Sequence, residues 1–519
     1  MLSEETPLLR PFENRVLSKS VVLGIVSTWI ASFTAAADST ITATLSSTIA
    51  NEFQSLTIIS WLGSGYLIAL TATQPLSGKL SDIFGRKASF FAAAVVFALG
   101  NLLCGLANSQ QSLIIGRVIA GIGGGGCSSI STFISSDFIP PRSRGLWHSY
   151  GTLVHAAGLG CGAVFGGAIN DTLGWRWAFI VLAPLSLIAA VAVAVTLLQK
   201  SSVKSEGLGQ KLRRIDYAGS MTLVLSLAVL LVYLNQEHDS PGASTPGFYA
   251  KVAIPVSTML LALFIIIELY WAQEPIIPLA IFGSRTVLAA CLTVCFVSVS
   301  YYTMMFYVPL YLQLRGHSPS QTGVLLLPES VGAACGSLTV GLVARKRGQY
   351  GEFKLLLPCL LALGAAGFTL ITRTVYPAHS DASSVAILPE IYLFLNGAGS
   401  GGMITVTLLA LLSAVPYAKQ ATATSGFLAF RSIGQNLGVS MSGAVFRSSL
   451  GRSSGDGSDF DGDRDAYMRA LYSTFGLAVA SAGLAFICVL FVKNYRLRSG
   501  FEESKDEDRQ ESGDGEDAA

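Results

Sequence analysis

The sequence predicts an all-α membrane protein with fourteen spanning helices, arranged as two six-helix halves with two further helices inserted between them. The chain is 51% hydrophobic and 13% charged, with a mean hydropathy of +0.56, whereas soluble domains carry about 25% charged residues. Many windows of about 20 residues hold one charge or none, enough to cross ~30 Å of hydrocarbon. Two glycine-rich motifs also recur in the same order in each half.

The apolar windows place the spanning helices near residues 20–42, 58–78, 88–107, 112–134, 147–169, 178–198, 217–234, 251–271, 286–309, 320–344, 355–374, 388–413, 421–446 and 470–492. Lysines and arginines gather in four short loops on one side, which the positive-inside rule makes cytosolic. An even number of helices puts both termini there. The stretch 447–469 carries four arginines on the opposite side and disagrees with this orientation.

Five segments follow from this topology. They are a cytosolic N-terminal segment (1–19), an N-terminal half (20–198), a linker with the two inserted helices (199–285), a C-terminal half (286–495) and a cytosolic tail (496–519). The stretch 501–519 holds nine acidic residues against Lys505 and Arg509. Such a segment cannot bury enough apolar surface to fold, so we expect the tail to be disordered.

The stretch "RVIAGIGGGG" (117–126) aligns with "LFLNGAGSGG" (393–402), and four glycines coincide, which is the main evidence for the repeat. Its G-x-G-x-x-G spacing is also typical of a dinucleotide site, but no strand precedes it. Small residues four apart let helix backbones approach closely in lipid. We therefore predict helix-packing glycines, with generic packing as the alternative to a role in motion: Gly121, Gly125, Gly158, Gly162, Gly166 and Gly167.

Several motifs resemble the ordered signatures of the major facilitator superfamily: "GKLSDIFGRK" (78–87), "RVIAGIGGGG" and "GLGCGAVFGG" (158–167). "AADSTITATL", "GWRWAF" and "FRSIGQNLG" narrow the resemblance to its fourteen-helix drug:proton antiporter branch. "GIGGGGCSSISTFISSDFIPPRSRG" with "LSDIFGRK" is similar to fungal vacuolar basic amino acid transporters and their multidrug relatives. The resemblance covers residues 20 to 495 and implies the major facilitator fold, with its substrate site between the two halves.

Asp38 lies deep in the first spanning helix, where a carboxylate costs about 2.5–3.5 kcal/mol on insertion scales. It should therefore face a cavity or a partner. A buried acid can take up and release protons and can attract a cationic substrate, although a purely structural pair also fits. The resemblance implies a proton-coupling role for Asp38 and for Arg117, whose movement relative to an acid could gate protonation.

Four further polar residues are candidates for the same site. Glu329 in "LLLPESVGAACGS" is the candidate for a second coupling or cation-binding acid, although Pro328 could leave it near a solvated helix end. Arg431, Asn396 and Asn436 could line the same cavity, but hydrogen bonds between helices explain the asparagines equally well.

The segment 78–87 is predicted to be a cytosolic gating loop. Its glycines permit turning, and its acid can pair with neighbouring bases or with a helix N-terminus. The resemblance implies that this loop holds one conformation closed. The residues concerned are Gly78, Asp82, Gly85, Arg86 and Lys87.

The sequence contains no nucleophile elbow, no HExxH and no phosphate-binding GxxxxGK[ST] loop, so an enzyme is not expected. The eight cysteines show no zinc-ligand pairing. We expect no cofactor, no metal and no nucleic-acid partner, and transport by a monomer driven by a gradient. A receptor on the same scaffold that does not transport is a further alternative.

The expected function is therefore proton-coupled antiport by alternating access, which carries basic amino acids from the cytosol into the vacuole. A multidrug or toxin exporter of the plasma membrane is the alternative. Near the start, "EETPLLRP" places Glu4 ahead of Leu8 and Leu9 and resembles an acidic dileucine sorting signal read by a vesicle adaptor. With the resemblance, this signal predicts a multi-pass protein of the vacuolar membrane.

Overall fold

The computed structural model describes residues 19–55, 57–139, 141–196, 217–235, 246–271, 283–347, 351–374, 388–415, 420–453 and 464–493. These residues form sixteen helices and no strand. The helices correspond to the fourteen predicted spans, because two spans are each divided into a short and a long helix. Eleven spans in the described part are long and apolar enough to cross a membrane on length and composition alone.

The N-terminal helices are α1 (Lys19–Phe53), α2 (Thr57–Phe84), α3 (Arg86–Gly105), α4 (Gln110–Phe138), α5 (Pro141–Leu173), α6 (Trp175–Ile180) and α7 (Leu182–Thr196). The inserted helices are α9 (Tyr217–Asn235) and α10 (Pro246–Tyr270). The C-terminal helices are α11 (Arg285–Leu314), α12 (Pro319–Leu325), α13 (Leu327–Arg347), α14 (Phe353–Thr374), α15 (Leu388–Ala414), α16 (Gln420–Ser453) and α17 (Arg464–Leu490).

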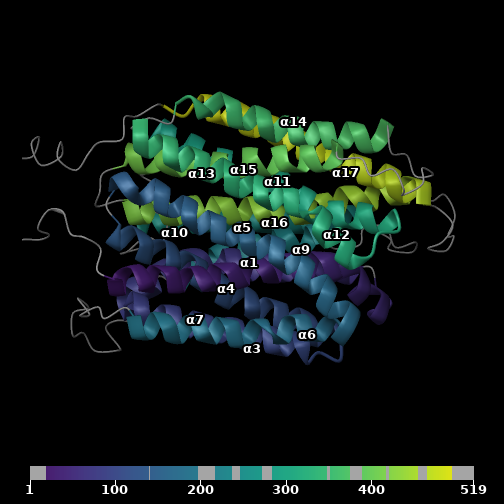
Figure 1. Ribbon diagram of the computed structural model, residues 1–519, viewed down its shortest axis with the longest axis horizontal. Coiled ribbons are helices and arrows are strands. Elements are labelled where there is room, and N and C mark those ends of the chain that lie inside the picture. Colours follow the sequence, from purple (N-terminus) through teal and green to yellow (C-terminus); the bar gives the residue numbers. More distant parts are fainter. Residues whose placement is uncertain are drawn as a thin grey trace, which may run out of the picture.

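The helices run along the long axis of the molecule, with the early helices on one side and the late helices on the other (Figure 1). Within each half, α4 packs on α2 and α3, and α15 packs on α13 and α14. The halves meet where α5 contacts α12 and α13 and where α16 contacts α2. The inserted helices pair through reciprocal 2.9 Å hydrogen bonds between the hydroxyls and carbonyls of Ser226 and Ser257.

Glycines create the same contacts in both halves. In α4, a Cβ at Gly121 or Gly125 would meet the backbone of α2, at Tyr66 and Leu70. In α15, a Cβ at Gly397 or Gly401 would likewise meet the backbone of α13. The structure therefore repeats the α4–α2 contact at α15–α13, at the aligned positions of the two glycine-rich stretches.

The α1–α5 contact follows the same rule. A Cβ at Gly158 would lie 2.5 Å from the carbonyl oxygen of Phe33, and one at Gly162 would lie 2.5 Å from that of Ala37. Gly166 faces Ile41, so glycines four apart on α5 follow residues four apart on α1. Gly167 is also buried in α5.

One predicted boundary is wrong. The segment 78–87 is almost entirely helical, because α2 continues to Phe84 and α3 begins at Arg86. The direction changes at Gly85, whose φ of +92° suits a residue without a side chain. The polar residues of this segment indicated a loop. They are compatible with helix as well, because a helix that extends beyond the membrane keeps its backbone hydrogen bonds in water. The predicted span near 320–344 corresponds to the single apolar span Ser320–Arg347, which is divided at Leu326 into α12 and α13.

We predict that Gly162→Ala destabilises the protein by about 1–3 kcal/mol, since the added methyl meets backbone that cannot yield freely. Gly483→Ala in α17 is the matched control, because nothing lies within 4 Å of a Cβ there. The control should be neutral or slightly stabilising, through helix propensity. Thermal unfolding of the purified protein, followed by tryptophan fluorescence, measures both. Equal melting temperatures for the two variants would contradict the packing role of Gly162.

Candidate functional site

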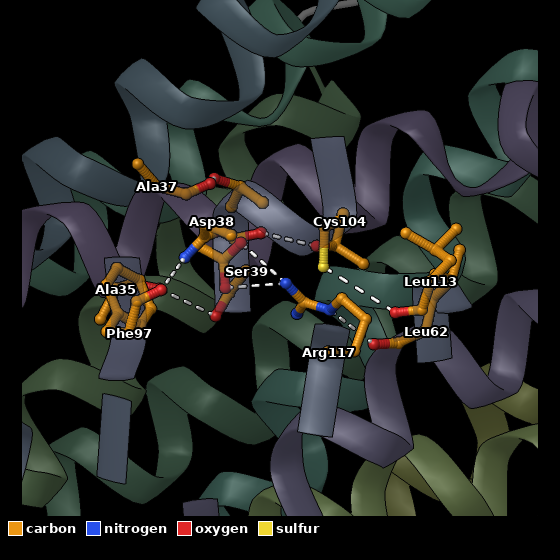
Figure 2. Close-up of polar contacts among 12 residues, drawn as sticks. Ala35, Ala37, Asp38, Ser39, Leu62, Phe97, Cys104, Leu113 and Arg117 are labelled. Carbon is orange, nitrogen blue, oxygen red and sulfur yellow. Dashed lines mark hydrogen bonds and ion pairs between the residues drawn. The ribbon is translucent and has the colours of Figure 1, made fainter. Parts of the chain in front are cut away.

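A fully buried ion pair joins α1 to α4. One terminal nitrogen of Arg117, Nη1, lies 2.7 Å from Oδ1 of Asp38 and 2.9 Å from Oδ2. The side chain of Arg117 is 1% exposed and that of Asp38 is not exposed. Figure 2 shows the guanidinium pointing from α4 toward the carboxylate on α1. The acid thus faces a partner inside the N-terminal half.

Arg117 makes further contacts with α2 and α6. Its Nε donates a 3.1 Å hydrogen bond to the carbonyl oxygen of Leu62 (Figure 2). Its guanidinium carbon lies 4.5 Å from the ring centroid of Tyr66 and 5.8 Å from that of Phe179. Aromatic faces attract cations, so a carboxylate, a carbonyl and two rings together compensate a charge that guanidinium cannot lose.

A buried pair of this kind makes each member depend on the other. Removing one partner leaves an uncompensated charge in a low dielectric, which costs about 3–5 kcal/mol. Protonation of Asp38 would have the same consequence, because it removes the negative charge that holds Arg117. The pair is therefore suited to change its geometry when one proton binds.

A cavity of about 190 Å³ lies between the two halves, beside this pair. Its walls come from α1, α2, α4 and α5 on one side and from α11, α15 and α16 on the other. The lining is mostly hydroxyl, aromatic and aliphatic, and Arg431 is its one charged side chain among the described residues. Polar and aromatic members include Trp29, Gln74, Trp147, His148, His155, Tyr302, Arg431 and Gln435.

The cavity lies toward the predicted cytosolic end. It is lined by the first half of α5 and α16 and by the second half of α4 and α15, which all lie near that end. At the other end the halves touch. Gln313 donates to the carbonyl oxygen of Thr44 at 3.2 Å, and the Ser320 hydroxyl donates to Asp171 at 2.6 Å.

Tyr66 connects the cavity to the ion pair. It lines the cavity, and its ring lies against the guanidinium of Arg117. A Cβ at Gly124 would lie 2.6 Å from the Tyr66 hydroxyl, so the glycine makes room for it. Ser39, next to Asp38 in the chain, also lines the cavity. A molecule in the cavity would thus lie one side chain away from the pair.

The other polar candidates occupy different places. Arg431 lines the cavity. Asn436 joins the halves, since its Nδ2 donates to the carbonyl oxygen of Leu67 on α2 at 2.8 Å. Glu329 and Asn396 are buried in the C-terminal half, away from the cavity lining. Glu329 is 3% exposed, despite Pro328, and its Oε1 has no hydrogen-bond partner among the described residues.

The predicted gating residues lie where α2 meets α3. Nε of Arg86 forms a 3.0 Å ion pair with Asp137 at the end of α4, and its guanidinium lies 5.2 Å from the Phe133 ring centroid. Lys87 is exposed, Gly78 lies within α2, and Gly85 makes the turn. The side chain of Asp82 lies outside the described residues, as do Glu4, Leu8 and Leu9 of the predicted sorting signal.

Sequence reasoning missed Tyr66 and Glu52. No motif singles out Tyr66, because only its packing on Arg117 distinguishes it. Glu52 ends α1 and accepts hydrogen bonds from Arg176 at 2.8 Å and from Trp175, both in "GWRWAF". These bonds hold the pKa of Glu52 below its usual range. The pair therefore persists as the pH falls into that range and is lost only at lower pH.

We predict that Asp38→Asn lowers the stability of the protein by about 3–5 kcal/mol, because Arg117 remains buried without its counter-charge. The double variant Asp38→Asn/Arg117→Gln should recover most of this loss, since both charges are then absent. Thermal unfolding of the three purified proteins measures the coupling. Additive losses in the double variant would contradict the pairing of these two residues.

Comparison with known proteins agrees with this architecture. The family model described as Major Facilitator Superfamily matches residues 28–439. The solved structure of the proton:xylose symporter XylE is similar with a TM-score of 0.58 at 14% identity, covering 93% of this chain and 98% of that one. A bacterial homologue of the human lysosomal transporter Spinster is similar with a TM-score of 0.60, also at 14% identity, over 92% of this chain and 98% of that one. The predicted fold is thereby confirmed.

Curated fungal relatives are similar over most of the chain. Multidrug resistance protein fnx1 of Schizosaccharomyces pombe is 30% identical, over 97% of this chain and 99% of its own. Vacuolar membrane amino acid uptake transporter fnx2 of the same organism is 30% identical, over 89% of this chain and 82% of its own. Vacuolar basic amino acid transporter 2 of Saccharomyces cerevisiae is 32% identical, over 76% of this chain and 83% of its own. The names of the latter two relatives agree with the predicted multi-pass protein of the vacuolar membrane.

Proposed function

Because this chain belongs to the major facilitator superfamily, we propose that it is a proton-coupled antiporter that moves basic amino acids from the cytosol into the vacuole. The chain is a membrane-embedded transporter and not an enzyme. Proton coupling, direction and substrate are our proposal. The observation that carries it is the sealed Asp38–Arg117 pair, one side chain away from a cavity between the halves.

Alternating access provides the transport step. In the conformation described, the cavity lies toward the cytosolic end and the halves touch at the other end. A substrate enters from the cytosol, the halves rock, and the cavity opens to the lumen. The Gln313 contact is a neutral hydrogen bond that costs about 0.5–1.5 kcal/mol to exchange, and the Ser320 contact with the Asp171 carboxylate costs about 1.5–3 kcal/mol.

The ion pair provides the coupling step. With the cavity facing the acidic lumen, a proton binds Asp38 and releases Arg117, which moves against Tyr66 and disturbs the cavity wall. Return to the cytosolic side, where protons are scarcer, restores the pair. A proton moving down one pH unit supplies about 1.4 kcal/mol, enough for ~10-fold accumulation in electroneutral one-for-one exchange.

The similarity to basic amino acid transporters over most of the chain supports this substrate class. The second candidate is a multidrug or toxin exporter of the plasma membrane, supported by the similarity to fnx1 over nearly the whole of both chains. The two candidates share the same coupling step. They differ in the molecule that occupies the cavity and in the membrane that holds the protein.

The transport prediction is tested with labelled lysine and arginine in acidified vacuolar vesicles, from cells with and without the protein. We expect uptake that needs the protein and collapses when a protonophore removes the pH gradient. Asp38→Asn/Arg117→Gln should abolish gradient-driven uptake, because the proton-binding carboxylate is absent, while the pair's charge balance is kept. Uptake that is independent of the protein, together with altered drug tolerance, would favour the exporter. Full gradient-driven uptake by the double variant would remove Asp38 from coupling.

The location prediction concerns the dileucine motif near the start of the chain. If a vesicle adaptor reads it, replacing Leu8 and Leu9 by alanine moves a fluorescent fusion from the vacuole toward the cell surface. Lysine transport by the variant should persist, because the motif lies far in the sequence from the residues that line the cavity. A fusion that stays on the vacuole would show that the motif is not the required address. An unaltered fusion at the cell surface would contradict the vacuolar location itself.

A further inference from the structure

The cavity carries a positive charge, whereas a substrate that is only a cation would need a negative one. Among the described lining residues there is one permanent charge, that of Arg431, and no carboxylate. The two intramembrane acids of the sequence prediction do not line it, because Asp38 is paired with Arg117 and Glu329 is buried between helices of the C-terminal half. A molecule that carries only positive charge would therefore meet repulsion from Arg431.

Arg431 has no carboxylate beside it within the described part of the cavity wall. None of these residues forms a hydrogen bond or ion pair with it, in contrast to Arg117 in the other half. His148 and His155 on α5 lie close enough to interact with it electrostatically, and both line the same cavity. A guanidinium that lines a cavity and makes no hydrogen bond there suits a planar anion, because its N–H donors form a planar fork.

Carboxylate matches this fork geometry, since two parallel N–H···O bonds form at once. The cavity also offers aromatic surface for a cation. Trp29 on α1 and Trp147 on α5 both line it, with ring centroids 5.9 Å apart. Indole faces attract ammonium and guanidinium groups. The cavity therefore combines an anion site on α16 with a cation-tolerant wall on α1 and α5.

We propose that Arg431 binds the α-carboxylate of the substrate and that the protein thereby selects amino acids over amines. The inference rests on the proposed amino acid transport, and it names the α-carboxylate as the group of the substrate that the protein recognises. The cationic side chain of lysine or arginine then lies along the aromatic wall. Amines without a carboxylate, including cationic drugs, lose the contact with Arg431 and retain its repulsion.

The experiment uses the full chain in proteoliposomes with an imposed pH gradient, and measures competition against labelled lysine. The competitors are lysine, lysinamide, in which an uncharged amide replaces the carboxylate, and cadaverine, in which the carboxylate is absent. We expect lysinamide and cadaverine to compete about 10- to 100-fold more weakly than lysine, the range for losing one charge-assisted pair. This comparison needs no variant, so it does not depend on how a variant folds.

Variants of Arg431 assign the selectivity to this residue. Arg431→Gln should raise the KM for lysine by about 10- to 100-fold and remove the difference between lysine and lysinamide. Arg431→Lys keeps the charge but loses the fork, so part of the discrimination should remain. Ser448→Ala, which changes an exposed residue of α16 outside the cavity lining, should leave the ratio of lysine to lysinamide unchanged. Thermal unfolding of each variant checks that it is folded.

The outcomes separate this inference from the proposed function. If the unaltered protein takes up lysine but lysinamide competes equally, carboxylate recognition is wrong and amino acid transport stands. If discrimination persists in a folded Arg431→Gln, the carboxylate binds elsewhere and the assignment to Arg431 is wrong. If neither lysine nor arginine is taken up under any gradient, the proposed function fails, and this inference fails with it.

Discussion

Arg117 is the constraint on which the N-terminal half depends. Guanidinium remains charged in proteins, so a bundle that places it in the middle of a membrane must bring compensating groups to it. Asp38 on α1, the Leu62 carbonyl on α2 and the rings of Tyr66 and Phe179 do so. Three helices therefore converge on one side chain of α4. The rotation of α1 that aims Asp38 at Arg117 also turns Ser39 and other residues of α1 toward the cavity.

The two halves share a packing scheme but differ in their charges. Glycines of α4 and α15 accept the backbones of α2 and α13 in the same way, because removing a side chain is the simplest route to close helix approach in lipid. At the position aligned with Arg117, the C-terminal half has Leu393, which is buried in a hydrophobic cluster. Among the described residues, the second half has no fully buried ion pair like Asp38–Arg117, and Arg431 of α16 lines the cavity.

The contacts between the halves suit relative movement. Several of them are hydrogen bonds of hydroxyl and amide groups, such as those of Ser64 with Ser440 at 3.4 Å and of Asn436 with the Leu67 carbonyl. Ser149 on α5 donates to the Ser337 carbonyl on α13 at 2.9 Å. Such bonds can exchange partners without exposing an unpaired charge. The fully buried Asp38–Arg117 pair lies within one half, so rocking of the halves does not by itself have to break it.

The sequence alone determined the helices and their closest contacts. Apolar run length and small residues four apart are local properties, so they predicted the spans and the glycine surfaces of α4 and α5 without any tertiary information. The same local signals predicted a loop at 78–87 where the chain is helical, because charged residues mark where a helix leaves the membrane and not always where it stops.

Only the tertiary structure decided what each polar residue faces. The direction of a side chain depends on the rotation of its helix and on the neighbours that pack beside it, and no spacing in the chain encodes both. From the sequence, Asp38 could equally have lined a cavity, but in the structure it pairs with Arg117. Glu329, Asn396 and Arg431 had the same standing as intramembrane polar residues, yet only Arg431 reaches the cavity. Tyr66 gained its place beside the ion pair because three helices meet there, which is a property of the packed bundle and not of any one segment.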